Sequence, residues 1–363
     1  MIGVVCTSYP RSPEDPAGSF VRTRVRALAR AGPPVEVLSA GEEGETTEGQ
    51  VKVVRLAGIG VKDLFYQGGA PEALTARTGR GAAWLEALGF TARLTALVAR
   101  KAGGWDAVES HWLLPSTLAV CAVAPRLRHR AYAHGGDVFL LERLPWGASL
   151  AREICRTGVE LRFVSRDLRE RFCSLCGAAP ETWGARASVE PAPVDASVFR
   201  PWSPRERQSA RDRLGMSGLT VMAAGRLVPI KGFDILVLAL ARLPIGLRPR
   251  LVVAGDGPEA SRLRRLARDA HVDLCLTGNL SHADLAERMA AADLFVHPSR
   301  SLMDGRHEGA PLVVREALAL GIPVIATASG VDQIPKSLVR MAQSFDLAPR
   351  AIVVRVILPG ALP

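Results

Sequence analysis

The sequence has no uninterrupted apolar run of 18 residues, and its first residues do not form a signal-peptide pattern. The opening segment MIGVVC is short and is followed at once by polar residues, unlike the apolar part of an export signal. A membrane-spanning helix needs about 20 predominantly apolar residues. The sequence therefore predicts a soluble, unexported protein with a cytoplasmic location.

Cysteine is sparse and scattered: the six residues are Cys6, Cys121, Cys155, Cys173, Cys176 and Cys275. In a large chain this pattern is typical of a reducing compartment and argues against a disulfide framework. Cys173 and Cys176 form a C-x-x-C pair, but no second pair of ligands lies nearby at the spacing of a zinc site. We therefore interpret them as two thiols on one face of a helix.

Acidic residues are outnumbered by basic ones, 36 to 46, and nearly all the basic residues are arginine. The formal net charge of +10 favours anionic partners, such as nucleotide-sugar phosphates, lipid phosphates, a membrane surface or nucleic acid. The arginines are spread along the chain, without a basic run interleaved with aromatic residues. Nucleic acid is therefore the least favoured partner, and peripheral contact with the inner face of a membrane remains open.

A chain of 363 residues exceeds the size of one ordinary hydrophobic core and predicts two domains. Four prolines between residues 191 and 204 are typical of an extended linker. We place the boundary there, with domains at 1–195 and 196–363. In both halves short apolar strands alternate with helical segments, which predicts an α/β fold with two Rossmann-like domains and parallel, doubly wound sheets.

Three residues of the first half stand where a predicted strand gives way to a loop or helix. Gly18 precedes a helix expected from Ser19, where a backbone without Cβ can approach a phosphate, although a simple turn glycine explains it equally well. His111 and His134 each stand at the carboxyl end of a predicted strand. Because ligands in open α/β sheets bind beyond these ends, the two histidines favour a ligand-facing edge.

In the second half, Arg226 and Lys231 lie on a loop after a strand and just before a helix. Two cations and the N–H groups of a helix start form a site for a diphosphate. Residues 255–260, GDGPEA, match the dinucleotide motif G-x-G-x-x-A. A dinucleotide site needs an acid at the end of the next strand, but Asp273 precedes that strand. We therefore interpret GDGPEA as a turn with Pro258 at the first helical position, and not as an NAD site.

The segment from 307 to 327 carries two glutamates eight positions apart. Glu308 lies in a glycine-containing loop, and Glu316 lies inside an amphipathic helix that Pro311 starts. At about 1.5 Å per residue, Glu316 is roughly 7–8 Å further along the helix axis than Pro311. Two carboxylates separated in this way can hold opposite ends of one extended ligand, although each is also acceptable as a solvated helix residue or a helix-entry charge.

Several segments, taken in order, carry a resemblance to a known family. The segments GRLVPIKGFDILVLAL, LVVAGDGPE, LTGNLSHADLAERMAAADLFVHPS and EGAPLVVREALALGIPVIAT resemble the donor-binding half of a GT-B glycosyltransferase of family 4. Upstream, HGGD and PAPVDASVFRP are similar to that family's HGxD and PNGVDxxxFxP, with Ala192-Pro193 in place of Asn-Gly. The resemblance implies two domains that face each other across a cleft.

The resemblance also implies roles for the matching residues. Arg226 and Lys231 neutralise the diphosphate of a UDP- or GDP-sugar donor. Glu308, the first acid of the E-x7-E motif, holds donor-sugar hydroxyls beside Gly309, and Glu316, the second, accepts hydrogen bonds from the ribose. From the other domain, His134 faces the donor sugar and Gly18 approaches the diphosphate.

The implied reaction retains the anomeric configuration, and the departing phosphate takes the acceptor's proton. The implied acceptor is a glycan or a lipid-linked glycan of bacterial polysaccharide or glycolipid synthesis. No Asp-x-Asp motif stands at the donor site, so no metal and no further cofactor is expected. Two alternatives stay open: a non-catalytic or truncated nucleotide-sugar-binding relative, and a nucleotide-sugar epimerase, against which the E-x7-E motif argues.

After Thr327 the sequence departs from the family pattern. The family continues with GGxxE and ends with a helix that crosses back to the first domain, whereas 328–333 keeps one glycine and no matching glutamate. The remaining residues contain a single helical segment and an apolar strand. We therefore expect a C-terminus that is shortened relative to the family, a less constrained hinge and weaker catalysis.

Overall fold

The chain divides into two compact units. A computed structural model describes residues 1–12, 15–58, 64–65, 73–74, 80–178, 182, 186–303, 307–327, 339–341 and 354–357. The first unit comprises Met1–Arg11 and Ala17–Pro193, and the second comprises Ser12–Pro16 and Val194–Pro363. This division lies two residues before the boundary predicted between residues 195 and 196, which stays a prediction for the domains.

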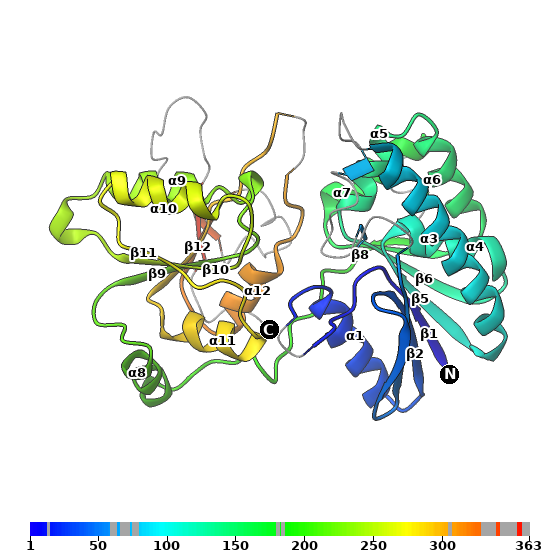
Figure 1. The fold of residues 1–363 in the computed structure, drawn as a ribbon, viewed down its shortest axis with the longest axis horizontal. Helices are drawn as coiled ribbons and strands as arrows, with labels where there is room; N and C mark the ends of the chain where they lie inside the picture. Colours follow the sequence, from blue (N-terminus) through cyan, green and yellow to red (C-terminus); the bar gives the residue numbers. More distant parts are fainter. Residues whose placement is uncertain are drawn as a thin grey trace. The chain divides into compact units, whose positions relative to one another are not determined.

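The first unit is an eight-stranded sheet with helices on both faces (Figure 1). Its strands are β1 (Ile2–Val5), β2 (Val35–Ala40), β3 (Gly44–Glu48), β4 (Val51–Leu56), β5 (Ala107–His111), β6 (Arg128–Ala133), β7 (Glu160–Phe163) and β8 (Ala187–Val189). Its helices are α1 (Ser19–Arg30), α3 (Arg80–Lys101), α4 (Leu118–Val123), α5 (Gly136–Arg143), α6 (Gly147–Arg156) and α7 (Arg166–Cys176).

Alternating side chains divide the first core into two layers. Val4 and Val37 pack with helix α1 on one face of the sheet, and Val5 and Leu38 pack with helices α3 and α4 on the other. The strand order is β3-β4-β2-β1-β5-β6-β7-β8, and neighbours are parallel except β3 and β4. The predicted alternation of strand and helix therefore gives a doubly wound sheet, as expected for helices on both faces.

The second unit repeats this architecture. Its strands are β9 (Thr220–Ala224), β10 (Arg250–Ala254), β11 (Leu274–Leu276), β12 (Leu294–His297), β13 (Val324–Thr327), β14 (Val339–Met341) and β15 (Val354–Ile357). Its helices are α8 (Pro204–Arg213), α9 (Phe233–Ala241), α10 (Ala260–Asp269), α11 (His282–Ala291) and α12 (Leu312–Ala319). Val221 and Ala223 pack with α9 and α10 on one face, and Met222 and Ala224 pack with α11 and α12 on the other.

The strand order in the second sheet is β11-β10-β9-β12-β13-β15-β14. The five strands from β11 to β13 are parallel, which confirms the predicted α/β class with two Rossmann-like sheets. β15 runs antiparallel to β13, and β14 runs antiparallel to β15. The prediction of a parallel sheet therefore holds for these five strands and not for β14 and β15. The remaining expectations for the C-terminus fall on residues outside the described ranges.

Helix α3 corrects the expectation that no segment is long and apolar enough to span a membrane. Gly81–Gly104 meets that test by length and composition, with 39% of its apolar window buried. One such helix is weak support for a span, because the core helix of a soluble protein meets the same test. Phe90 and Leu94 are buried in the core beside the sheet, whereas Leu85 and Leu88 are 74% and 62% exposed.

Candidate functional site

The candidate site lies in the second unit, at the point where the strand order reverses. β9 leads to β10 on one side and lies beside β12 on the other, and ligands of open α/β sheets bind beyond the strand ends at such a point. Lys231 follows β9, His297 ends β12, and Glu308 lies on the loop after β12. The Nζ atom of Lys231 donates to Oε1 of Glu308 at 2.5 Å. His297 Nε2 lies 2.5 Å from Glu308 Oε2.

The Glu308 carboxyl is ionised in this arrangement. Burial raises its pKa, but the charge of Lys231 and the contact with His297 outweigh burial and hold the pKa well below its usual range. An ionised carboxylate only accepts hydrogen bonds, so the proton between the two side chains belongs to His297 Nε2. The other ring nitrogen, Nδ1, is buried without a partner among the described residues. Among the described residues, Glu308 is therefore the partner of the His297 ring.

The loop that carries Lys231 is fixed by backbone hydrogen bonds on two sides. Leu227 N–H donates to the Asp256 carbonyl at 2.9 Å, and Glu259 N–H donates to the Leu227 carbonyl at 3.0 Å. On the other side, Arg300 N–H donates to the Ile230 carbonyl at 2.9 Å. The GDGPEA segment is thus a turn that holds the lysine loop. Its helix α10 begins at Ala260, two residues later than predicted.

Gly232 brings this loop next to β12. It has a φ of 66° and precedes α9, and a Cβ at this position would lie 2.1 Å from the carbonyl oxygen of Pro298. Only glycine accepts this conformation and this approach without strain. Lys231 is therefore placed beside the strand end that bears His297. Arg226 lies on the same loop with an exposed side chain.

Glu316 differs from Glu308 in its protonation state. It lies inside α12, where it is 3% exposed, and burial raises its pKa to about 8. Pro311 caps α12 from the position before its first residue, and Gly309 is half-buried in the preceding loop. At neutral pH the Glu316 carboxyl is therefore mostly protonated, so it can donate as well as accept a hydrogen bond.

This pKa predicts how stability depends on pH. Between about pH 4.5 and pH 8 the unfolded chain has lost the Glu316 proton and the folded chain keeps it. The free energy of unfolding therefore falls as pH rises, by at most about 1.4 kcal/mol per pH unit. Glu316→Gln is expected to remove this pH dependence. The free energy of unfolding of the variant, measured with urea, should therefore increase relative to that of the wild type from pH 5 to pH 9.

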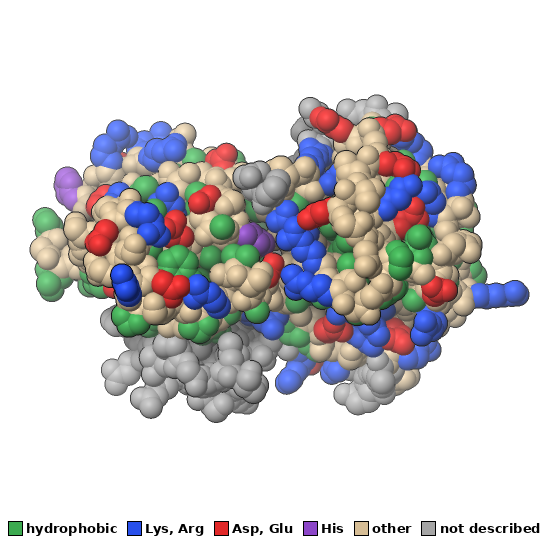
Figure 2. Space-filling model, turned by 90° about the horizontal axis from the view of Figure 1, so that it is seen from below, with side chains coloured by type: hydrophobic (Ala, Val, Ile, Leu, Met, Phe, Trp, Pro, Cys, Tyr) green, Lys and Arg blue, Asp and Glu red, His purple; other side chains and the backbone are tan. Residues whose placement is uncertain are grey.

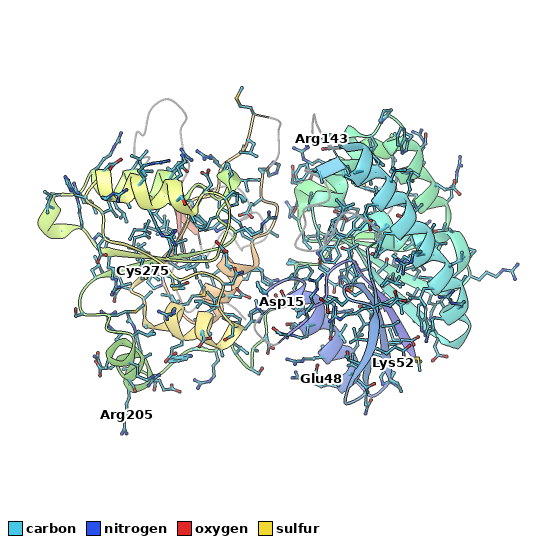
Figure 3. All side chains as sticks on the ribbon, in the orientation of Figure 1. Asp15, Glu48, Lys52, Arg143, Arg205 and Cys275 are labelled. Atoms are coloured by element: carbon cyan, nitrogen blue, oxygen red, sulfur yellow. The ribbon has the colours of Figure 1, made fainter. Side chains whose placement is uncertain are left out.

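Glu48→Gln supplies the matched control, because Glu48 lies on the surface in β3 (Figure 3) and its side chain is 67% exposed. That variant should follow the wild-type pH profile within the error of the urea curves. Parallel pH profiles for Glu316→Gln and the wild type would contradict the raised pKa.

The first unit presents its own polar strand ends. His111 Nδ1 and His134 Nε2 lie 3.1 Å apart, with their rings nearly parallel at 14°. Burial lowers the pKa of both histidines, that of His111 to about 3. The Asp137 carboxylate accepts from the N–H groups of Leu113 at 2.8 Å, Gly135 at 2.9 Å and His134 at 3.2 Å. Asp137 thereby fixes the turn that carries His134.

Gly18 has a steric reason to be glycine. Its φ is 72°, and a Cβ would lie 2.1 Å from the Ser8 carbonyl oxygen. This packing supports the turn-glycine interpretation, and the approach to a phosphate stays a prediction.

Two further features concern the surface charge and the grouping of metal-ligand residues. On the face shown in Figure 2, Lys and Arg side chains are interspersed with acidic and uncharged ones. Within the described ranges, no three His, Cys, Asp or Glu residues are grouped so that they could hold a metal ion.

Comparisons with known proteins point to one family. The Glycosyl transferases group 1 family matches residues 204–340. A GDP-mannose-dependent monoacylated alpha-(1-6)-phosphatidylinositol monomannoside mannosyltransferase of Corynebacterium glutamicum is 35% identical over 55% of this chain and 52% of its own. A GDP-mannose-dependent alpha-(1-6)-phosphatidylinositol monomannoside mannosyltransferase of Mycobacterium tuberculosis is 37% identical over 61% of this chain and 59% of its own.

The curated relatives are thus matched over little more than half of their length. A likeness over the whole fold comes from the sucrose-phosphate synthase of Thermosynechococcus elongatus, with a TM-score of 0.64 at 18% identity, covering 92% of this chain and 82% of that one. The matched residues 204–340 contain Lys231, His297, Glu308 and Glu316. Residues 204–340 are thus similar to the Glycosyl transferases group 1 family, and the fold of the chain is like that of a solved sucrose-phosphate synthase.

Proposed function

We propose that the protein transfers a sugar from a nucleotide-diphosphate sugar to a glycan or lipid-linked acceptor, with retention of the anomeric configuration. The observation that carries this proposal is the contact of Lys231 and His297 with one ionised carboxylate, Glu308, at the switch point of the second sheet. That arrangement places a cation, Lys231, and an anion, Glu308, in direct contact. A donor with a diphosphate and a hydroxyl-rich sugar uses both.

The basic side chains and the Glu308 carboxylate contact opposite sides of the glycosidic bond of the donor. Lys231 and Arg226 neutralise the diphosphate and the charge that builds up on it as the glycosidic bond breaks. Glu308 accepts hydrogen bonds from donor-sugar hydroxyls, and the N–H of Gly309 lies beside it in the chain. Because Lys231 pairs with Glu308, a bound donor displaces part of this ion pair and finds both side chains already in position. Glu316 binds the ribose hydroxyls.

The first unit supplies the acceptor side of the proposal. His134, held by Asp137 and in contact with His111, faces the donor sugar, and Gly18 approaches the diphosphate. The acceptor hydroxyl attacks from the face that the diphosphate leaves, and the leaving phosphate takes its proton. The proposed sugar transfer takes place in the cytoplasm, with the acceptor lipid at the inner face of the membrane.

The proposal is tested with purified protein and a panel of GDP-, UDP- and ADP-sugars. GDP-mannose is the first donor to try, because both curated relatives are described as GDP-mannose-dependent. Mass spectrometry of products formed with a lipid extract identifies donor and acceptor together. Donor binding measured by calorimetry without any transfer or hydrolysis would instead favour the non-catalytic nucleotide-sugar-binding alternative.

Activity is expected to be independent of divalent metal ions. The proposed site uses the Lys231 and Arg226 cations for the task that a metal performs in other transferases. Treatment with EDTA, followed by gel filtration, should leave the transfer rate unchanged. Loss of activity that Mg²⁺ or Mn²⁺ restores would contradict the metal-independent mechanism.

A further inference from the structure

Two thiols from different helices meet in the core of the first unit. Cys155 lies near the end of α6 and Cys176 is the last residue of α7, and their Sγ atoms are 3.8 Å apart. Both are buried, at 5% and 8% exposure. Cys176 is three residues from Cys173 in the C-x-x-C motif, but its thiol contact is to Cys155, 21 positions away. The contact thus joins the C-x-x-C motif on α7 to a cysteine on α6.

We propose that Cys155 and Cys176 are a modification site at which a reversible disulfide bond links α6 to α7. A disulfide has an S–S length of about 2.05 Å, so the two sulfur atoms must approach by roughly 1.8 Å through side-chain rotation. The helices already pack against each other, which holds the two thiols side by side. The site is independent of the proposed sugar transfer.

The reaction takes a low-molecular-weight disulfide as oxidant. One protein thiolate attacks the reagent, forms a mixed disulfide and releases one reagent thiol. The second protein thiol then displaces the other reagent thiol and forms the Cys155–Cys176 bond. The two protein thiols lose two electrons and two protons, and the reagent gains them as two thiols. In a reducing compartment the bond is transient and thiols reverse it.

The local structure favours Cys176 as the first nucleophile. The hydrogen bond from Cys155 lowers the pKa of Cys176, and the nearby Arg152 acts in the same direction against burial. Cys176 ends α7, and Gly177 follows it as a left-handed cap with a φ of 72°. Helix ends open more readily than helix centres, and both thiols lie in the last turn of their helices, so a reagent can reach the pair. Cys173, one turn earlier, is fully buried at 0% exposure.

The experiment maps the bond in the full chain. The reduced protein is treated with oxidised glutathione, unfolded in urea, blocked with N-ethylmaleimide and digested with trypsin. We expect a cross-link between peptides 153–156 and 172–186, with the maleimide on Cys173. The linked protein should show a midpoint of thermal unfolding higher by about 5 °C, which dithiothreitol reverses.

Three alanine variants identify the partners. Cys173→Ala should keep the cross-link, whereas Cys155→Ala and Cys176→Ala should lose it. If a variant does not fold by circular dichroism, the peptide map of the wild type decides alone. A link that involves Cys173 would overturn the proposal. So would glutathione adducts without a cross-link, or no reaction under conditions that oxidise the urea-unfolded chain.

Discussion

Lys231→Ala is expected to lower kcat/KM for the nucleotide-sugar donor by roughly 10²–10³-fold, the scale for losing one preorganised group that stabilises a developing anion. The structure adds a second effect, because Lys231 is the partner of the Glu308 carboxylate at 2.5 Å. Its removal leaves that largely buried charge with His297 alone and should lower the free energy of unfolding by about 1–3 kcal/mol. Steady-state kinetics and urea unfolding measure the two effects separately.

The double variant Lys231→Ala/Glu308→Gln separates these effects. Removing the carboxylate charge should restore most of the lost stability, while activity stays low because the diphosphate still lacks its cation. Lys52→Ala is the matched control: Lys52 (Figure 3) also pairs with a glutamate, Glu45, at 2.7 Å, but on the surface of β4. It should change neither quantity. Wild-type kinetics in Lys231→Ala would remove the diphosphate role.

Most of the fold could be predicted because buried parallel strands are short apolar runs. β1, β2, β4, β9 and β10 are all short runs rich in apolar residues, because both faces of each are covered. β3 was missed because its sequence, GETTE, is exposed throughout and contains no apolar residue. The sequence of an exposed edge strand carries no alternation that would reveal it.

Helix α8 was missed for a different reason. Its start, Ser203-Pro204-Arg205-Glu206, is a complete capping box with proline at the first position, and this signal is legible in the sequence. The proline cluster before it favoured a linker that extends to residue 204. A similar signal stands at Ser281, whose side chain caps α11 by accepting from the N–H of Asp284.

The site was predictable by residue type but not by pairing. Glu308 and Lys231 were each predicted from loops after strands, yet they are 77 positions apart, and nothing in the sequence says that their side chains meet. His297 was missed because a histidine at the end of an apolar strand resembles a core residue. The rule that drew attention to His111 and His134, position at a strand's carboxyl end, applies to His297 as well.

The protonation state of Glu316 could not be predicted from the sequence either. Its position in a helix with alternating apolar residues permits either a solvated or a buried side chain, and only the packing of α12 against β12 and β13 decides. Burial makes this carboxyl a proton-bearing group at neutral pH, while Glu308, eight positions earlier, is a carboxylate. Two acids of one motif therefore differ in protonation at neutral pH.

Glu308→Gln is expected to lower kcat by roughly 10²-fold or more while nucleotide affinity changes little. The amide keeps the shape of the side chain but removes the charge that Lys231 and His297 hold in place, and this charge is proposed to act on the reacting sugar. Turnover with the identified donor and calorimetry with the nucleoside diphosphate give the two numbers. A larger loss in affinity than in kcat would place Glu308 on the nucleotide instead.

Glu316→Gln is the matched comparison, with the opposite expectation: weaker nucleotide binding and a smaller change in kcat. Because the wild-type carboxyl is mostly protonated at pH 7, it already resembles an amide there, and the loss of affinity should be larger at pH 9 than at pH 7. Ribose hydroxyls donate best to the ionised form, so wild-type affinity itself should rise across this interval as the proton leaves. Equal behaviour of the two variants, or a pH-independent difference at position 316, would break the assignment of the two acids to opposite ends of the donor.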